Sequence, residues 1–146
     1  MERTLALIKP DGVRRGLVGE VIGRLEKSGL SIVALKMMRL DAGQAEAHYR
    51  VHRGKPFYPM LLEHITSGPV VAAVCEGPAA VERLRELVGA TDPALARPGT
   101  IRGDLGLDIT QNVIHASDSP ETAVSEIRLF FPEIGGARLV EAGAEP

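Results

Sequence analysis

Four short apolar runs, each of strand length, constrain the fold of this 146-residue chain more than any other feature. They occupy residues 3–9, 31–40, 69–76 and 109–115. The third run has the strongest strand character, because every position from 70 to 75 is valine, alanine or cysteine. Continuous apolar runs of this length are typical of buried strands. We therefore predict a strand at each of the four positions.

The segments between these runs carry the signals of helices. Apolar residues recur every three or four positions over 18–25 and 81–88, and the Ser-Pro pair at 119–120 is typical of a helix start. Shorter helices are expected over 42–52 and 60–66. This order predicts an α+β fold, a ferredoxin-like βαββαβ sandwich with a four-stranded antiparallel sheet and helices on one face. Such a fold alone names no function.

Residues 90–108 interrupt the pattern before the last predicted strand. The segment contains two prolines and three glycines and has no clean period. Loops of such length in compact domains are usually functional or disordered. We expect a single domain over residues 1–138 that carries this long insertion loop. The tail at 139–146 follows a Gly- and Ala-rich stretch and is expected to be weakly ordered.

The charge balance limits the classes of partner. Seventeen Lys and Arg against nineteen Asp and Glu give a formal charge of −2, which argues against electrostatic binding of the whole molecule to nucleic acid or to an anionic membrane. No apolar run approaches the roughly 20 residues of a membrane span. Cys75 is the single cysteine, and the N-terminal sequence lacks a signal-peptide layout. We therefore expect a cytoplasmic protein in a reducing compartment.

The chain has four histidines, and they differ in their sequence context. His48 and His52 are four residues apart on an expected helix, but no third ligand sits in a supporting motif, so a zinc site is disfavoured. His64 lies near a helix end and is expected on the surface or in a cap. His115 ends an apolar strand, where a side chain faces a cleft from a rigid element. This segment alone leaves a buried core histidine as an equal alternative.

The insertion loop before His115 favours a reactive role for it. Residues 97–104 offer two arginines, a threonine and two glycines. Arginine binds phosphate through paired hydrogen bonds, and glycine lets backbone N–H groups approach an anion. The preceding helix adds Arg83 and Arg85, and Lys9 lies where the first strand ends. Cations around one strand-end histidine match phosphoryl transfer, which depends mostly on positioning and charge neutralisation.

These residues resemble the nucleoside diphosphate kinase family over about residues 3–131. The family motif around the phosphorylated histidine, Asn-x-x-His-(Gly/Ala)-Ser-Asp, is met in full by residues 112–118. The resemblance implies transfer of the terminal phosphoryl group of a nucleoside triphosphate to a nucleoside diphosphate. It also implies a ping-pong mechanism through a phosphohistidine at His115. Further matches lie at residues 4–12, 48–49, 55–57, 67–71 and 89–104.

The same resemblance implies roles for the residues around the nucleophile. Glu126 matches a carboxylate that bonds the second ring nitrogen of His115, which fixes the tautomer of the ring. Ser117 matches a serine that hydrogen-bonds this carboxylate. Tyr49 matches a tyrosine beside the nucleophile.

Nucleotide contacts are implied in the same way. Lys9 and Asn112 match groups at the ribose hydroxyls, and Lys9 also lies near the transferring phosphoryl group in the family. Arg85, Thr91 and Arg102 match the residues that bind the outer phosphates.

Phe57 matches the aromatic residue that stacks on the base. Low base selectivity follows, because every base offers a π-face. Mg²⁺ would be held mainly by the nucleotide phosphates, since the chain has no dedicated carboxylate cage, and no protein ligand to a metal is expected.

A homo-oligomer, tetramer or hexamer, is implied, but residues 132–146 depart from the usual family ending and leave the choice open. Tyr58 replaces a common second phenylalanine, and we expect no loss of function from it.

Two alternatives come from other classes of protein. A ferredoxin-like module that senses nucleotides without transferring phosphate would not need a strand-end histidine with a matching Glu126 and Ser117. A nucleic-acid-binding protein on the same scaffold is disfavoured as the primary role by the charge of −2 and by the lack of interleaved aromatic and basic residues. The expected partners are nucleoside tri- and diphosphates.

Overall fold

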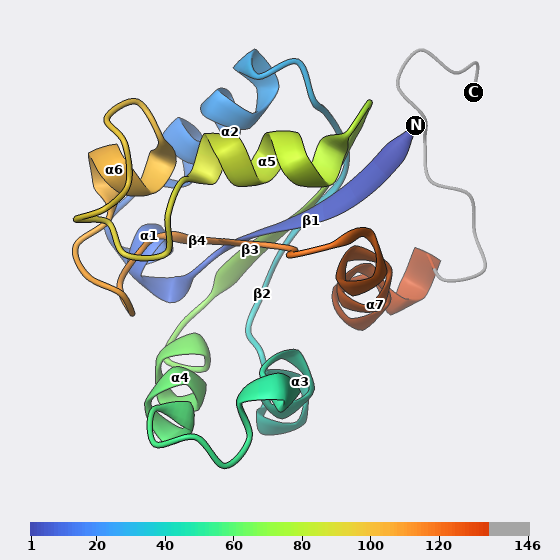
Figure 1. The fold of residues 1–146 in the computed structure, drawn as a ribbon. Coiled ribbons are helices and arrows are strands. Elements are labelled where there is room, and N and C mark those ends of the chain that lie inside the picture. The colour runs from blue at the N-terminus through green and yellow to red at the C-terminus, as the bar shows by residue number, and fades with distance from the viewer. Residues whose placement is uncertain (135–146) are drawn as a thin grey trace.

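A single antiparallel sheet forms the centre of the molecule (Figure 1). The computed structural model describes residues 1–134, and its strands are ordered β2-β3-β1-β4 across the sheet. This topology confirms the predicted ferredoxin-like βαββαβ fold. Leu7 of β1 lies opposite Ala72 of β3 and opposite His115 of β4, so the histidine sits on an edge strand next to the centre of the sheet. The strands are β1 (Glu2–Ile8), β2 (Ser31–Met38), β3 (Val70–Gly77) and β4 (Ile114–Ala116).

Helices cover both faces of this sheet. The helices α2 (Val18–Lys27) and α5 (Ala80–Val88) pack on one face, against Ala6 and Ile8 of β1. These are the two helices of the βαββαβ motif, and for them the expectation of helices on one face is correct.

The opposite face is covered by α3 (Ala42–His48), α4 (Tyr58–Ile65) and α7 (Pro120–Phe130), which pack against Leu5 and Leu7. For these three helices the one-face expectation is wrong. The physical reason lies in the central strands, because every residue of β3 is buried and both of its faces therefore need apolar cover.

Shorter elements change some predicted boundaries. The short helix α1 follows β1 directly, and the predicted helix over 42–52 divides into α3 and η1. The predicted strand over 109–115 is only three residues long, because Val113 has a φ of 76° and a strand does not accommodate a positive φ. The short elements are α1 (Pro10–Arg14), η1 (Arg50–His52), α6 (Ile101–Leu105) and η2 (Pro132–Ile134).

The start of α7 agrees with the sequence. The Ser119 hydroxyl accepts a hydrogen bond from the backbone N–H of Thr122, at 3.1 Å, and Pro120 occupies the first turn. Within residues 1–134, none of the helices combines the length and the apolar character needed to cross a bilayer. The predicted weak order of the tail at 139–146 concerns residues outside the described range.

Candidate active site

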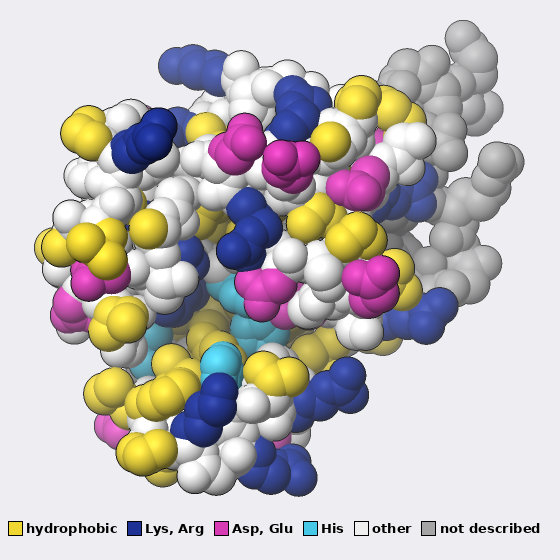
Figure 2. All heavy atoms as spheres, viewed as in Figure 1, with side chains coloured by type: hydrophobic (Ala, Val, Ile, Leu, Met, Phe, Trp, Pro, Cys, Tyr) yellow, Lys and Arg dark blue, Asp and Glu magenta, His cyan; other side chains and the backbone are white. Residues whose placement is uncertain are grey.

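A cavity of about 1090 Å³ opens beside the edge strand β4. Figure 2 shows it as a hollow with histidine side chains on its floor, above the lobe that α3 and α4 form in Figure 1. Of the ten site residues predicted from the sequence, only Ser117 does not line it. The nine that do are Lys9, Tyr49, Phe57, Arg85, Thr91, Arg102, Asn112, His115 and Glu126.

His115 meets a carboxylate from the neighbouring helix. Its Nε2 lies 3.1 Å and 2.9 Å from the two carboxylate oxygens of Glu126 on α7. The buried hydroxyl of Ser117 donates to the same carboxylate at 2.6 Å. Since a carboxylate only accepts, Nε2 of His115 carries the proton, and in a neutral ring Nδ1 keeps its lone pair. The three residues thus set up an imidazole with one defined nucleophilic nitrogen.

The Glu126 carboxylate is kept ionised despite its burial. Only 7% of the residue is exposed, and burial by itself favours the protonated acid. The hydrogen bonds from His115 and Ser117 outweigh burial, so the pKa of Glu126 lies below its ordinary value. The site therefore holds a fixed negative charge next to the ring that would become positive on attack.

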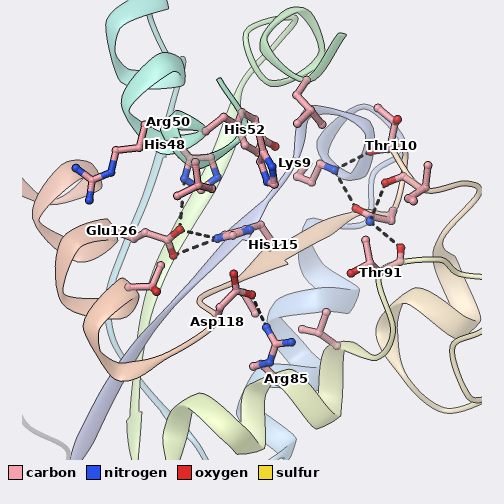
Figure 3. A pocket seen from close by; sticks show the side chains of 18 of the residues that line it. Lys9, His48, Arg50, His52, Arg85, Thr91, Thr110, His115, Asp118 and Glu126 are labelled. Atoms are coloured by element: carbon pink, nitrogen blue, oxygen red, sulfur yellow. Dashed lines mark hydrogen bonds and ion pairs between the residues drawn. The ribbon is translucent and has the colours of Figure 1, made fainter. Parts of the chain in front are cut away.

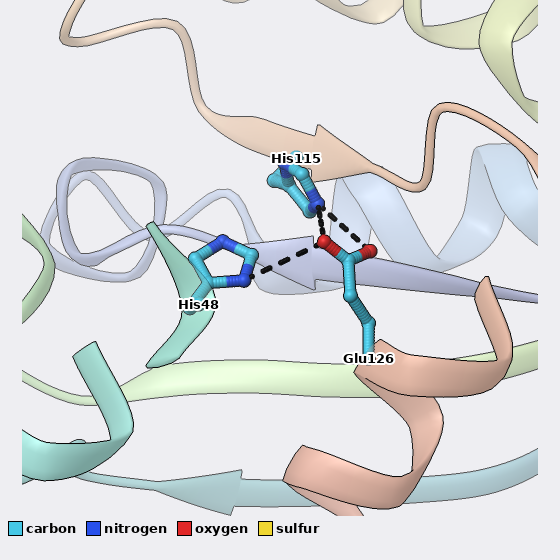
Figure 4. Close-up of side chains that lie close together, drawn as sticks. All are labelled: His48, His115 and Glu126. Atoms are coloured by element: carbon cyan, nitrogen blue, oxygen red, sulfur yellow. Dashed lines mark hydrogen bonds and ion pairs between the residues drawn. The ribbon is translucent and has the colours of Figure 1, made fainter. Parts of the chain in front are cut away.

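His48 is a member of this cluster that the sequence analysis did not place in the site (Figure 4). Its Nδ1 lies 3.6 Å from Oε2 of Glu126, and its ring packs edge-on against the His115 ring at 4.5 Å between centroids. Burial lowers the pKa of His48 to about 3, so the ring is neutral. His52, four residues away on the expected helix, contacts Lys55 at 3.2 Å instead.

Lys9 is fixed on the side of the cavity that lies away from Glu126 (Figure 3). Its Nζ donates to the Thr110 carbonyl at 2.7 Å and to Oδ1 of Asn112 at 2.9 Å. The Asn112 amide in turn donates to the Thr91 carbonyl at 2.9 Å. Burial lowers the pKa of Lys9 to about 8, with Arg102 adding to this effect and Asp11 opposing it. Lys9 is therefore a cation at neutral pH that loses its charge in mildly basic solution.

Asp11 holds the backbone that carries these groups, a role that the sequence did not reveal. Its carboxylate accepts the N–H of Val113 at 3.0 Å and lies 3.0 Å from Nε2 of His64. The Val113 carbonyl accepts the N–H of Lys9 at 2.8 Å. The His64 side chain is only 10% exposed, so of the two places expected for it, the surface and a helix cap, the surface is wrong. This network fixes the start of β4 relative to the end of β1.

Two arginines lie on the α5 and α6 side of the cavity. The Arg102 guanidinium donates to the carbonyls of Gly89, at 3.2 Å, and Ile114, at 2.6 Å. Burial, together with the nearby charge of Arg85, lowers the pKa of Arg102 to about 10, which still leaves it charged at neutral pH. Arg85 is exposed and donates to Asp118 at 2.6 Å. Figure 3 shows Arg85 and Asp118 below His115 in the view, and both line the cavity.

Two aromatic residues complete the lining. Tyr49 is buried, and burial together with the Glu126 charge raises its pKa to about 12, so its hydroxyl stays neutral. Phe57 is 41% exposed, and Lys55 lies 5.7 Å from its ring centroid. Phe57 thus offers an accessible aromatic face at the cavity surface. The cavity combines a nucleophilic nitrogen, several cations and an apolar platform, which suits a ligand with a ring at one end and phosphates at the other.

Comparison with known proteins identifies relatives over nearly the whole described chain. The sequence model of the family described as nucleoside diphosphate kinase matches residues 2–134. A nucleoside diphosphate kinase of Thermomicrobium roseum is 65% identical over 133 residues, which are 91% of this chain and 89% of that protein. One of Archaeoglobus fulgidus is 62% identical over 133 residues, 91% of this chain and 88% of the relative.

A solved structure with the same fold is that of a halophilic nucleoside diphosphate kinase from Halobacterium salinarum in complex with CDP. It is 48% identical in sequence and superposes with a TM-score of 0.90, covering 96% of this chain and 91% of the other.

Proposed function

The chain belongs to the nucleoside diphosphate kinase family, whose members are nucleotide phosphotransferases, and from this premise we propose a ping-pong reaction through a phosphohistidine at His115. In the first half-reaction the terminal phosphoryl group of a nucleoside triphosphate moves to the ring. In the second it moves to a nucleoside diphosphate. The observation that carries the proposal is the hydrogen bond between Nε2 of His115 and Glu126, because it leaves Nδ1 as the attacking atom.

Each half-reaction exchanges one bond at phosphorus. The lone pair of Nδ1 forms the N–P bond while the bond from the terminal phosphorus to its bridging oxygen breaks, and the diphosphate leaves with the electron pair. The ring becomes cationic as it attacks, with its proton retained on Nε2. The ionised Glu126 stabilises this charge, and Ser117 holds the carboxylate in place. Attack by the second nucleotide reverses these changes.

The cations on the cavity wall would neutralise the charge of the nucleotide phosphates. We assign Arg85, Thr91 and Arg102 to the outer phosphates. The guanidinium of Arg102 is held by two backbone carbonyls, so little reorganisation is needed when a phosphate binds. We assign Lys9 and Asn112 to the ribose hydroxyls, with Lys9 also near the transferring group.

Two further assignments concern the aromatic residues. Tyr49 lines the same cavity as His115, and we assign it the place beside the nucleophile, where its neutral hydroxyl would position the phosphoryl group. Phe57 stacks on the base, and its exposed face does not distinguish bases by hydrogen bonds, so purine and pyrimidine nucleotides should both react. The CDP complex of the Halobacterium salinarum relative supports the admission of a pyrimidine nucleotide.

A nucleotide kinase reaction generally needs a divalent metal, and we propose Mg²⁺ in this role. The residues present fit a metal that arrives on the nucleotide, because Asp118 is an exposed carboxylate on the cavity wall and is already paired with Arg85. The nucleotide phosphates would hold most of the coordination sphere of the metal. Bound there, Mg²⁺ would supply charge neutralisation on the transferring phosphoryl group.

The proposal also covers the domain boundaries, the assembly and the location of the protein. We propose one catalytic domain over residues 1–138 and assembly into a tetramer or hexamer. A cytoplasmic location is supported by the lone, buried Cys75, which fits a reducing compartment.

Initial-rate kinetics test the proposed mechanism. With ATP varied at several fixed concentrations of a pyrimidine nucleoside diphosphate, a ping-pong reaction gives parallel lines in a double-reciprocal plot. Lines that intersect would mean that both nucleotides bind together, and they would contradict the phosphohistidine route.

A further inference from the structure

His48 is a buried histidine whose ring nitrogens lack hydrogen-bond partners. The side chain of His48 is 1% exposed, and neither of its ring nitrogens has a hydrogen-bond partner. Buried polar atoms are almost always paired, so such an exception calls for an explanation. The proposed reaction uses Glu126 and His115 but assigns no step to the His48 ring, and its Nδ1 faces the Glu126 carboxylate at 3.6 Å (Figure 4).

We propose that His48, His115 and Glu126 form a binding site for a borderline-soft divalent ion such as Zn²⁺, and that its occupation switches off the proposed transfer reaction. Each of the three residues offers one donor atom, and these atoms all lie within 4.8 Å of one another. Nε2 of His115 is already 2.9 Å from Oε2 of Glu126. Donor atoms around a tetrahedral zinc ion are roughly 3.3 Å apart, given bonds of about 2.0–2.1 Å. The two distances to Glu126, 2.9 Å and 3.6 Å, are close to this spacing. The two imidazoles, whose donor atoms lie within 4.8 Å of each other, have to approach by at most about 1.5 Å to complete the site.

The chemistry of the donors selects the metal. Two imidazoles and one carboxylate form a ligand set that zinc enzymes use, with a fourth position left open, and here all three residues line the cavity. Mg²⁺ prefers oxygen ligands and would not compete well for two nitrogens. The neutral ring of His48 needs to lose no proton to bind. Lys9 and Arg102 line the same cavity and repel a cation, so we expect weaker binding than at a dedicated zinc site.

Occupation of this site changes the tautomer of the nucleophile. In the metal-free state Glu126 accepts the Nε2 proton of His115, and Nδ1 carries the lone pair. A metal bound to Nε2 takes the lone pair there, so the single ring proton of the neutral imidazole must move to Nδ1. A protonated Nδ1 cannot form an N–P bond. The metal therefore blocks the attacking nitrogen without needing to fill the nucleotide cavity.

Metal binding is tested on the complete chain without nucleotide, by titrating Co²⁺ as a spectroscopic substitute for Zn²⁺ and by calorimetry with Zn²⁺ itself. We expect visible Co²⁺ absorption of low-symmetry nitrogen and oxygen coordination, removed by excess Zn²⁺. His48→Phe keeps a planar ring at the site and should lower the affinity for both ions roughly 10- to 100-fold. His52→Phe, on the same segment, is the matched control and should bind the ions as the wild type does.

Two results would overturn the metal site. One is a wild-type chain with no saturable Co²⁺ absorption, and the other is equal affinity in the wild type and in His48→Phe. If circular dichroism shows His48→Phe to be unfolded, His48→Gln takes its place, with the same expected loss.

The proposed inhibition by zinc rests on the proposed function and is measured in a separate experiment. Zn²⁺ added before γ-labelled ATP should suppress labelling of His115, and a chelator should restore it. The Zn²⁺ concentration that gives half-inhibition should be at least roughly ten-fold higher for His48→Phe than for the wild type. ATP chelates zinc equally in both assays, so chelation cannot cause this difference. Equal zinc sensitivity in both would contradict the inhibition. If no label forms without zinc, the proposed function fails, while the Co²⁺ spectrum still decides the metal site.

Discussion

At the scale of single residues, the proposed chemistry depends on which nitrogen of one imidazole carries a proton. The Glu126 carboxylate accepts from Nε2 of His115 at 2.9 Å and is itself held by Ser117 at 2.6 Å. This arrangement orients the ring before the nucleotide arrives, so little of the binding energy has to be spent on ordering it. A neutral His48 on the other side of the carboxylate adds no competing positive charge.

Replacement of Glu126 by glutamine tests this role. The amide keeps the size of the side chain but removes the negative charge, and it can present an N–H rather than an oxygen to the ring. We expect kcat to fall by about 10²-fold, at the lower end of the effects of positioned acid–base groups, with little change in nucleotide affinity. Glu121→Gln, an exposed carboxylate on the same helix, is the control. A raised KM with unchanged kcat would show that Glu126 serves binding instead.

The charge of Lys9 gives a prediction for pH. Its pKa in the folded protein is about 8, below the ordinary value of 10.5, so Lys9 loses its proton as the pH rises through about 8. We therefore expect kcat/KM, which reports the free enzyme, to decline above this pH. The decline should precede any effect of Arg102, whose pKa is about 10. Lys9→Met should have a lower kcat/KM that stays flat across the same range, and an unchanged decline in this variant would assign the titration to another group.

Sequence reasoning proposed most of the polar residues that the structure gathers in the cavity, but not His48. His115, Glu126 and the cations belong to motifs that the resemblance covers, and nine of the ten predicted residues line one cavity. His48 comes from a different segment of the chain, and its approach to Glu126 depends on how α3 packs beside α7. A helical spacing contains no information about such a long-range contact. It offered only His52, which lies on the same segment, and that pair was already disfavoured for lack of a third ligand.

At the scale of secondary structure elements, the order of strands and helices was predictable, whereas the boundaries near the site were not. The apolar run before His115 predicted a strand over 109–115, but β4 begins only at Ile114. The positive φ of Val113 and the bond from its N–H to Asp11 interrupt the strand. This interruption brings the Lys9 and Asn112 side chains together. Asp11 acts from the far end of the sequence, so local pattern alone could not predict it.

The start of α7 offers a test at this scale. Ser119 caps the helix that carries Glu126, since its hydroxyl accepts the N–H of Thr122. Ser119→Ala should lower the free energy of unfolding by about 1 kcal/mol, the usual cost of losing an N-cap, as measured by chemical denaturation. Ser125→Ala, an exposed position within the same helix, should have a much smaller effect. Equal losses in the two variants would mean that the cap does not stabilise α7.

At the scale of the whole molecule, residues 1–134 cover both faces of the sheet except along part of its β2 edge. Leu35 is 52% exposed and Met37 is 60% exposed, and both belong to this edge strand. An apolar edge strand left in water invites pairing with another chain. The edge therefore supports the proposed homo-oligomer, and we propose it as one surface through which subunits would associate.

Replacement of Leu35 by glutamate tests this interpretation. Two charges would face each other where two copies of the edge meet, so the mass in sedimentation should shift from that of a tetramer or hexamer toward smaller species. Val124→Glu places the same charge on an exposed position of α7 and serves as control. A monomeric wild type, or an unchanged mass in Leu35→Glu, would contradict the assignment of this edge.

The net charge of −2 can also be compared with where the cations lie in the structure. The molecule as a whole does not attract anions, and the cations that matter for the proposed reaction, Lys9, Arg85 and Arg102, are gathered in one cavity beside β4. Binding of phosphates is therefore expected to depend on this local arrangement rather than on the field of the whole protein.

The most direct test of the central claim is to trap the phosphorylated protein. The chain is mixed with γ-labelled ATP and Mg²⁺, denatured, and followed for protein-bound label. We predict label that is stable in base and labile in acid, that is absent from His115→Ala, and that leaves when any nucleoside diphosphate is added before denaturation. Label on a serine, label that persists in His115→Ala, or no label at all would contradict transfer through His115.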